Sequence, residues 1–170
     1  MLIKYLPWQK LEWERLEAQF ERFPHALLLH GRPGTGKLHL ANVLAQSLLC
    51  EHRADERLAC GKCAACLWFA SGNHPDFRLI QPESMASGTA EDDETAETTE
   101  EGRKKLSKQI KIEQIRALGD FLNLGSHRNG HRVVLICPAE VMNAGAANAL
   151  LKSLEEPAAG VAGPRLAGAE

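Results

Sequence analysis

The sequence lacks long hydrophobic runs, a secretion signal and an excess of charge of either sign. No apolar stretch approaches the roughly 18 residues that suggest a membrane-spanning helix, so we expect no membrane insertion. The first residues show no sustained apolar stretch with a small-residue cleavage site, so they do not form a signal peptide. The net charge is −2, which provides no global basic field for nucleic acid. We therefore expect a cytoplasmic protein.

What is present is ordinary for a globular domain. The chain has 170 residues, of which 44% are hydrophobic and 25% charged, enough for one domain with its own core. It contains five cysteines. Without a secretion signal, cysteines in this number indicate a reducing compartment and metal or thiol chemistry rather than disulfides.

Hydrophobic periodicity predicts helices that alternate with short apolar strands. The pattern predicts strands at 26–30, 77–80 and 131–137, and helices at 11–23, 37–49, 109–124 and 143–155. The strands at 26–30 and 131–137 are nearly continuous in apolar residues, so we expect these two to be buried on both faces. This order is typical of an α/β fold in which a parallel sheet is flanked by helices.

Two segments depart from this pattern. Residues 84–102 are rich in Asp and Glu with small fillers, which predicts a disordered surface insertion. The tail at 158–170 is rich in Ala and Gly and shows no strand or helix pattern. A sheet of only three strands would have poorly covered edges, so we expect the chain to stop before its fold is complete.

A glycine-rich turn lies between the first strand and the second helix. Gly31, Gly34, Gly36 and Lys37 match the G-x-x-x-x-G-K part of a phosphate-binding loop. In such a loop backbone N–H groups surround a phosphate and the lysine reaches the outer phosphates. The next residue should carry a hydroxyl that binds Mg²⁺, but here it is Leu38, which cannot bind a hard cation.

The partner position for that metal is also altered. An acidic pair is expected at the end of a later buried strand, and this strand ends in Cys137 and Pro138. With both metal positions lost, we do not expect Mg²⁺ binding or Mg²⁺-dependent ATP hydrolysis. Two interpretations of the loop stay open, a simple tight turn and residual nucleotide binding.

Four cysteines lie close together in the sequence. Cys50, Cys60, Cys63 and Cys66 include two C-x-x-C steps that share Cys63. Four thiolates suit tetrahedral zinc, and four protein ligands leave no position for water, so we predict a structural zinc site. Free buried cysteines and redox chemistry are the alternatives. We interpret Cys137 as a small core residue.

Other polar residues give weaker signals. His74, before a proline, is a candidate to support the zinc site from outside its ligand shell. Arg32, Lys37, Arg128 and Arg132 could form a small basic patch, but we interpret them as solvated surface charge. No Ser/His/Asp or paired-carboxylate arrangement suggests catalysis.

Taken together, these motifs resemble the clamp-loader subunits of bacterial DNA polymerase III, which are AAA+ proteins. The resemblance covers about residues 5–157 and rests on 24–37, the four cysteines, 73–76, 110–116 and, above all, the run NALLKSLEEP at 148–157. It implies a P-loop NTPase-like domain at 1–157 with a zinc module inserted at 50–66.

At Leu38 and Cys137 the sequence departs from the ATPase subunits of this family. In this it resembles the delta-prime type of subunit, which does not hydrolyse ATP. This resemblance implies no catalytic site in the chain itself, although such subunits belong to a DNA-directed DNA polymerase (nucleotidyltransferase) holoenzyme. It implies gamma/tau and delta subunits as partners and, through the complex, the sliding clamp and primer-template DNA. The family's Ser-Arg-Cys motif and later domains are not found, so we expect a truncated or frameshifted chain after residue 157.

Two other functions stay in view. An active ATPase subunit of the gamma/tau type would fit the fold, but Leu38 and Cys137 speak against it. A free-standing zinc module that binds DNA would fit the cysteines, but no basic stripe lies along any expected helix.

Overall fold

A parallel four-stranded sheet forms the centre of the molecule. The computed structural model describes residues 4–53, 57–86, 106–123, 131–155 and 165–169. The strands are β1 (Ala26–Leu29), β2 (Phe77–Ile80), β3 (Val133–Ile136) and β4 (Arg165–Ala169), in the spatial order β1-β4-β3-β2. All three strand pairs are parallel, which confirms the predicted α/β class.

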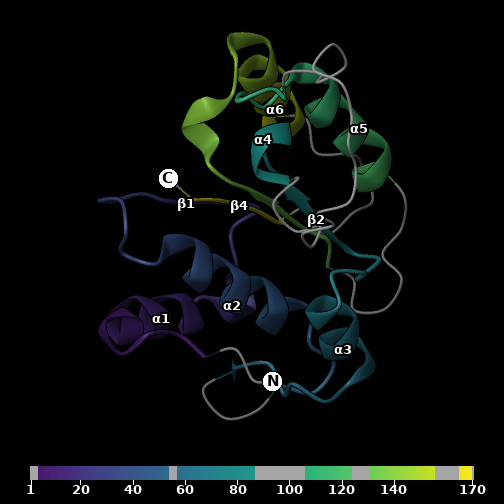
Figure 1. Ribbon diagram of the computed structural model, residues 1–170. Coiled ribbons are helices and arrows are strands. Elements are labelled where there is room, and N and C mark those ends of the chain that lie inside the picture. The colour runs from purple at the N-terminus through teal and green to yellow at the C-terminus, as the bar shows by residue number, and fades with distance from the viewer. Residues whose placement is uncertain (1–3, 54–56, 87–105, 124–130, 156–164, 170) are drawn as a thin grey trace, which may run out of the picture.

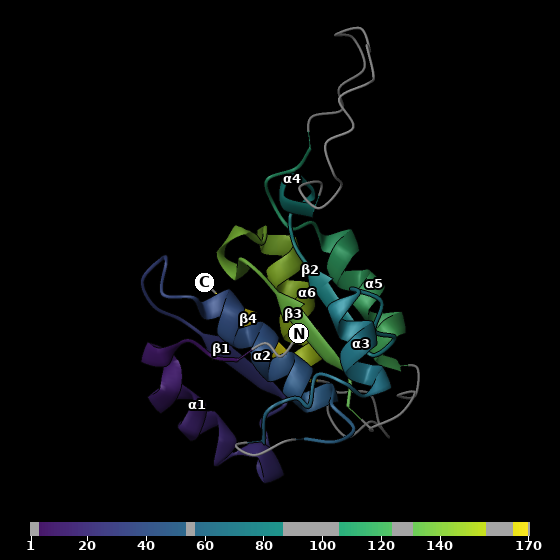
Figure 2. The ribbon, with the colours of Figure 1, turned by 60° about the horizontal axis from the view of Figure 1, so that its bottom comes forward.

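Helices cover both faces of the sheet (Figure 1). On one face lie α1 (Lys10–Glu17), α2 (Lys37–Leu49) and α3 (Ala64–Ala70), and on the other α5 (Ile112–Asn123) and α6 (Ala144–Glu155). Shorter turns are η1 (Pro7–Gln9), η2 (Phe20–Arg22), α4 (Glu83–Ala86) and η5 (Ala139–Val141). Figure 2 shows the same layers from a second side. In the described part of the chain, no helix is both long and apolar enough to cross a membrane.

Strand β3 joins two cores. Val133 packs with Trp13, Leu44 and other residues of the α1–α2 layer, whereas Val134 packs with the α5–α6 layer. All four residues of β3 are buried, as predicted for a strand covered on both faces.

Strand β1 differs from this expectation. It lies at the edge of the sheet that the described residues form, and the side chain of Leu28 is 60% exposed. The prediction that this strand is buried on both faces is therefore wrong, because its neighbours cover only part of it.

The tail also differs from the prediction. Residues 165–169 form β4, which pairs with β1 on one side and β3 on the other. The prediction that the tail has no strand is thus wrong for these five residues. Small residues have low strand propensity, so pairing with two neighbouring strands determines this conformation rather than local sequence.

The helix boundaries are close to those predicted. The first predicted helix is divided, because α1 ends at Glu17 and η2 follows. The last helix begins just after Asn143, whose side-chain oxygen accepts a hydrogen bond from the backbone N of Ala146 at 2.8 Å. Asparagine is a favoured residue for this capping position.

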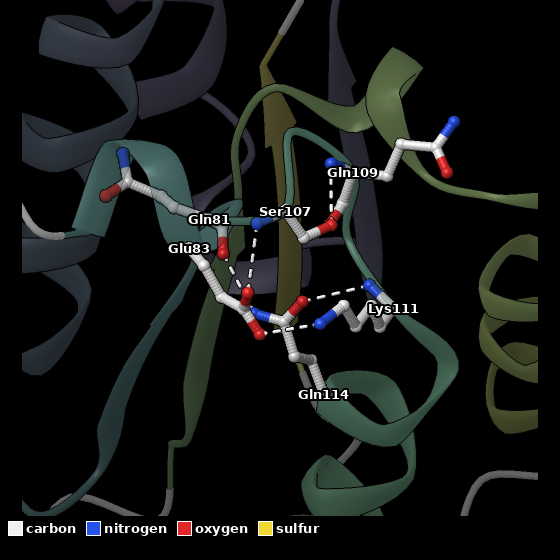
Figure 3. Close-up of polar contacts among 6 residues, drawn as sticks. All are labelled: Gln81, Glu83, Ser107, Gln109, Lys111 and Gln114. Carbon is white, nitrogen blue, oxygen red and sulfur yellow. Dashed lines mark hydrogen bonds and ion pairs between the residues drawn. The ribbon is translucent and has the colours of Figure 1, made fainter. Parts of the chain in front are cut away.

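The predicted acidic insertion at 84–102 lies mostly outside the described residues, which resume at 106. Residues 84–86 are described, and they belong to α4 rather than to a disordered loop. A polar network holds the two sides of this segment together (Figure 3).

Glu83 is the centre of that network. Its carboxylate accepts hydrogen bonds from the backbone N of Ser107 at 3.0 Å and from Nζ of Lys111 at 2.8 Å. The backbone N of Ser84 donates to the backbone oxygen of Ser107 at 3.1 Å. Gln114 of α5 donates to the backbone oxygen of Gln81 at 2.8 Å. These hydrogen bonds therefore hold the chain just before the acidic segment against the chain just after it.

Candidate metal centre and phosphate loop

Helix α2 separates the two predicted sites. Gly36 is its N-cap and Cys50 its C-cap, so the glycine loop precedes the helix and the cysteine cluster follows it. Thirteen helical residues span about 20 Å at 1.5 Å per residue. The two sites are thus linked by one element but lie at its opposite ends.

The structure brings the four predicted cysteines together. Cys60 lies in the loop after Cys50, Cys63 is the N-cap of α3, and Cys66 lies in the first turn of α3. Their sulfur atoms all lie within 4.8 Å of one another, and the sulfurs of Cys50 and Cys63 are 3.9 Å apart. Zinc–sulfur bonds of about 2.3 Å in a tetrahedron would separate the sulfurs by about 3.8 Å. The cluster therefore has the donors and the size for such an ion.

Backbone N–H groups orient the sulfurs. Cys60 N donates to the sulfur of Cys50 at 3.3 Å, Cys63 N to that of Cys60 at 3.4 Å, and Cys66 N to that of Cys63 at 3.5 Å. Gly61 has a φ of 70°, a conformation that glycine adopts at low cost. Around this turn the backbone N–H groups of Lys62 and Cys63 point at the sulfur of Cys60, which stabilises its thiolate.

The thiols of the cluster differ in acidity. Burial raises the pKa values of Cys50 and Cys66. Burial also acts to raise the pKa of Cys60, but hydrogen bonds from the backbone of Lys62 and Cys63 outweigh it and hold that pKa at about 6. Several thiolates this close together repel one another, and a divalent cation would compensate their charge. The four cysteines therefore fit a metal ion.

Cys137 does not belong to the cluster. It is buried at the end of β3, and burial raises its pKa, with Glu140 acting in the same direction and Lys37 against it. Its backbone N donates to the oxygen of Ile80 at 3.0 Å. The position thus agrees with its interpretation as a small core residue.

Two arginines connect the cysteine module (residues 50–66) to α2 and η2. Arg53 donates to the backbone oxygens of Ser47 and Leu48 at the end of α2, at 2.9 and 3.3 Å, and lies 5.2 Å from the ring centre of Phe20. Arg57 forms an ion pair with Glu21 at 2.6 Å. Sequence reasoning missed both, although basic residues after a helix end are a known C-terminal signal.

Side chains of the protein itself form hydrogen bonds with the backbone oxygens of the glycine loop. Nζ of Lys37 donates to the backbone oxygens of Gly31 and Arg32 at 2.8 and 2.9 Å. The side chain of Gln9 donates to the oxygens of Thr35 and Gly36 at 3.1 and 2.9 Å. Lys37 would have to exchange two hydrogen bonds to reach a phosphate.

Gly34 and Gly36 both have a φ of 81°, which favours glycine. A methyl group on Gly36 would lie 2.8 Å from Leu6 and 2.9 Å from Gln9, so this glycine also permits close packing. Gly31 has a φ of 146° and open space around it. The loop thus keeps the glycine geometry of its motif.

Leu38 is half-buried. Its side chain packs against the core cluster of Ala41 and Leu135, between α2 and the sheet. An open cavity of about 570 Å³ lies beside the loop, and Trp8, Leu28, His30 and Lys37 are among the residues that line it. The cavity is large enough for a ligand, but the hydroxyl and the acidic pair of a magnesium site are replaced by apolar and thiol groups.

His74 and Arg132 are both buried. Nδ1 of His74 accepts a hydrogen bond from the backbone N of Asp76 at 3.0 Å, and the ring lies edge-on to Trp68 of α3. Burial lowers the pKa of His74, although the negative charges of Asp76 and Glu51 act to raise it. Arg132 is 2% exposed, so its interpretation as solvated surface charge is wrong. Its guanidinium faces the buried carboxylate of Asp76.

Comparison with known proteins agrees with the fold and the motifs. The family model described as DNA polymerase III, delta subunit, matches residues 8–162. The chain is 40% identical over 151 residues to DNA polymerase III subunit delta-prime of Pseudomonas aeruginosa, a match that covers 89% of this chain and 39% of that protein. It is 35% identical to the delta-prime subunit of Yersinia pestis, covering 91% of this chain and 40% of that protein.

A solved structure shares the fold. The gamma subunit-related protein of Thermotoga maritima superposes with a TM-score of 0.56 at 20% identity, covering 92% of this chain and 38% of that one. The chain thus spans about two fifths of the length of the curated relatives that it matches. From the family match and these relatives, the chain belongs to the DNA polymerase III delta-prime family.

Proposed function

We propose that the chain acts as a non-catalytic, delta-prime-like stator subunit of a clamp loader, which helps to load the sliding clamp onto DNA during replication. The observation that carries the proposal is Leu38, whose half-buried side chain packs against Ala41 and Leu135 at the position where an ATPase subunit needs a hydroxyl. The end of β3 at Cys137 supports it, because a thiol replaces an acidic residue there.

The cluster of Cys50, Cys60, Cys63 and Cys66 is proposed to hold a structural zinc ion. Four soft donors leave no open coordination position, and their loop is anchored at both ends by α2 and α3. Zinc bound there would neutralise the thiolates and fix the loop. Elemental analysis of the purified protein should find about one zinc per chain.

The glycine loop is proposed to serve as a structural turn. Gly31, Gly34 and Gly36 shape it, and Lys37 closes it by binding two of its carbonyl oxygens. Equilibrium dialysis with a non-hydrolysable ATP analogue tests this assignment. Binding that Lys37→Ala removes would instead support a residual nucleotide site.

The proposed partners are the gamma/tau and delta subunits, with the sliding clamp and primer-template DNA reached through the complex. This role belongs in the cytoplasm. The test is co-expression of the chain with the other loader subunits of its own organism, followed by affinity capture and size-exclusion chromatography. Co-elution supports the proposal, and consistent failure to associate with any loader subunit contradicts it.

The alternative of an active gamma/tau-type subunit has its own test. The purified chain should show no Mg²⁺-dependent ATP turnover above the background of a Lys37→Ala variant prepared in parallel. Turnover that Lys37→Ala abolishes would remove the non-catalytic assignment. A free-standing DNA-binding zinc module would instead bind duplex DNA without any loader subunit.

A further inference from the structure

A buried charge pair lies between the cysteine module and the far face of the sheet. Asp76 is 1% exposed and Arg132 is 2% exposed, and Oδ1 of Asp76 lies 3.7 Å from Nε of Arg132. Burying two charges costs free energy unless the surrounding structure holds them in place. The contacts on each side of the pair identify that structure.

Asp76 connects the pair to the cysteine module and to β3. Its backbone N donates to Nδ1 of His74 at 3.0 Å, and its backbone oxygen accepts from the N of Val133 at 3.0 Å. The ring of His74 lies 6.1 Å from that of Trp68, at 75°. Trp68 belongs to α3, two residues after Cys66. This turn therefore touches both α3, which contains Cys66 and is capped by Cys63, and the first residue of the central strand β3.

Arg132 connects the pair to α5. Its guanidinium carbon lies 4.8 Å from the ring centre of Phe121, and that of Arg78 on β2 lies at the same distance from the same ring. Phe121 is buried in the core of the α5–α6 layer. The series of contacts thus runs from α3 through the sheet edge to the helix on the opposite face.

We propose that Asp76 and Arg132 are positioning residues that couple the metal centre to β3 and α5. When metal fixes the cysteines, α3 holds Trp68 against His74 of the turn, and the turn keeps Asp76 buried beside Arg132. When metal is lost, the turn loosens and the constraint on Arg132 and Phe121 weakens. Coupling between two sites is reciprocal, so disrupting the pair also weakens metal binding. This inference rests on the metal site proposed above and goes beyond it.

Hydrogen exchange on the unmodified chain tests the first direction. Amide exchange is measured by mass spectrometry with Zn²⁺ bound and after chelation. Chelation should speed exchange in residues 133–136 and 118–122 as well as in the cysteine module, with little change in residues 40–44 of α2. Faster exchange confined to residues 50–70 would overturn the coupling. A chain that binds no Zn²⁺ would overturn the metal site and the coupling together.

Zinc affinity tests the reverse direction. By competition with a chromogenic chelator, Asp76→Asn should weaken Zn²⁺ binding about tenfold, a size typical of coupling between separate sites. The matched control is Leu118→Ala, which loosens the core of α5 without removing the charge pair. Equal weakening in both variants, or none in a folded Asp76→Asn, would overturn the proposal. If Asp76→Asn does not fold, the exchange measurement on the unmodified chain still decides.

Discussion

At the scale of single residues, Leu38 occupies the position where a phosphate loop carries serine or threonine, and its side chain packs with Ala41 and Leu135. One branched apolar side chain thus removes a metal ligand and adds core contact. The change is compatible with the turn itself, because the backbone of the loop keeps its glycine geometry.

Restoring the hydroxyl alone should not restore activity. We expect Leu38→Thr to show no Mg²⁺-dependent ATP turnover, because Cys137 still replaces an acidic residue at the end of β3. The variant should lose about 1 kcal/mol of unfolding free energy through lost apolar burial. Valine has nearly the same shape as threonine but carries no hydroxyl, so Leu38→Val serves as the control. ATP turnover in Leu38→Thr but not in Leu38→Val would contradict this expectation.

Gly36 and Gly34 form a natural matched pair, since both have a φ of 81°. Gly34→Ala should cost about 1–2 kcal/mol of unfolding free energy, for backbone strain alone. Gly36→Ala should cost more, because its methyl group would lie 2.8 Å from Leu6 and 2.9 Å from Gln9. Urea denaturation of the two variants measures the difference. Equal losses would show that Leu6 and Gln9 move aside freely.

The cysteine cluster and the altered loop could be predicted from the sequence, but the burial of individual charged side chains could not. Arg132 precedes a strand and looks like any surface arginine in the sequence. Its burial depends on Asp76, which lies more than fifty residues earlier, and on Phe121 of another element. Pairing over such separations leaves no local pattern. The exposure of Leu28 was missed for a similar reason, because it depends on which strands lie beside β1.

At the scale of elements, the strand pattern was predictable where apolar residues run together and failed where they do not. β1, β2 and β3 carry such runs, whereas β4 is composed largely of Ala and Gly after Arg165 and Leu166. Backbone pairing with β1 and β3 fixes β4, and such pairing is not encoded by the propensity of the strand itself.

The cysteine module offers a direct metal test at this scale. Cys60→Ser should lower the zinc content well below one per chain and lower the Tm, because it removes one of four donors. Cys137→Ser removes a buried thiol outside the cluster and should keep the full zinc content. Elemental analysis and thermal unfolding check both. Retained zinc in Cys60→Ser would exclude Cys60 as a ligand.

The polar network around Glu83 predicts that the acidic segment can be shortened. We expect a four-residue Gly-Ser linker in place of residues 88–104 to shift the Tm by no more than about 3 °C, because Ser84 and Ser107 already hold the two sides together. The same deletion combined with Glu83→Ala should lower the Tm further. A large loss of stability with Glu83 intact would mean that residues 88–104 contribute contacts of their own.

At the scale of the whole molecule, the layered arrangement places the glycine loop and the cysteine cluster at opposite ends of α2. Most residues of this helix are buried between α1 and the sheet, so it acts as a rigid spacer between the loop and the cluster. The layers and the parallel sheet could be predicted from the alternation of helices and strands. The spacing of the two sites also follows from sequence, because it depends only on the length of one helix.

The sulfur of Cys63 is one of the four proposed metal ligands. It also caps α3, because it accepts a hydrogen bond from the backbone N of Cys66. A helix of seven residues is too short to be stable by itself, so α3 depends on that cap and on the ion that would hold it. Proteases cut unfolded backbone, and Lys62 lies directly before this helix. Limited trypsin digestion should therefore cleave at Lys62 readily once zinc is chelated, and much more slowly when zinc is bound. The rate of cleavage at Lys62, followed by mass spectrometry of the fragments, would report the metal state of the protein without any measurement of the metal.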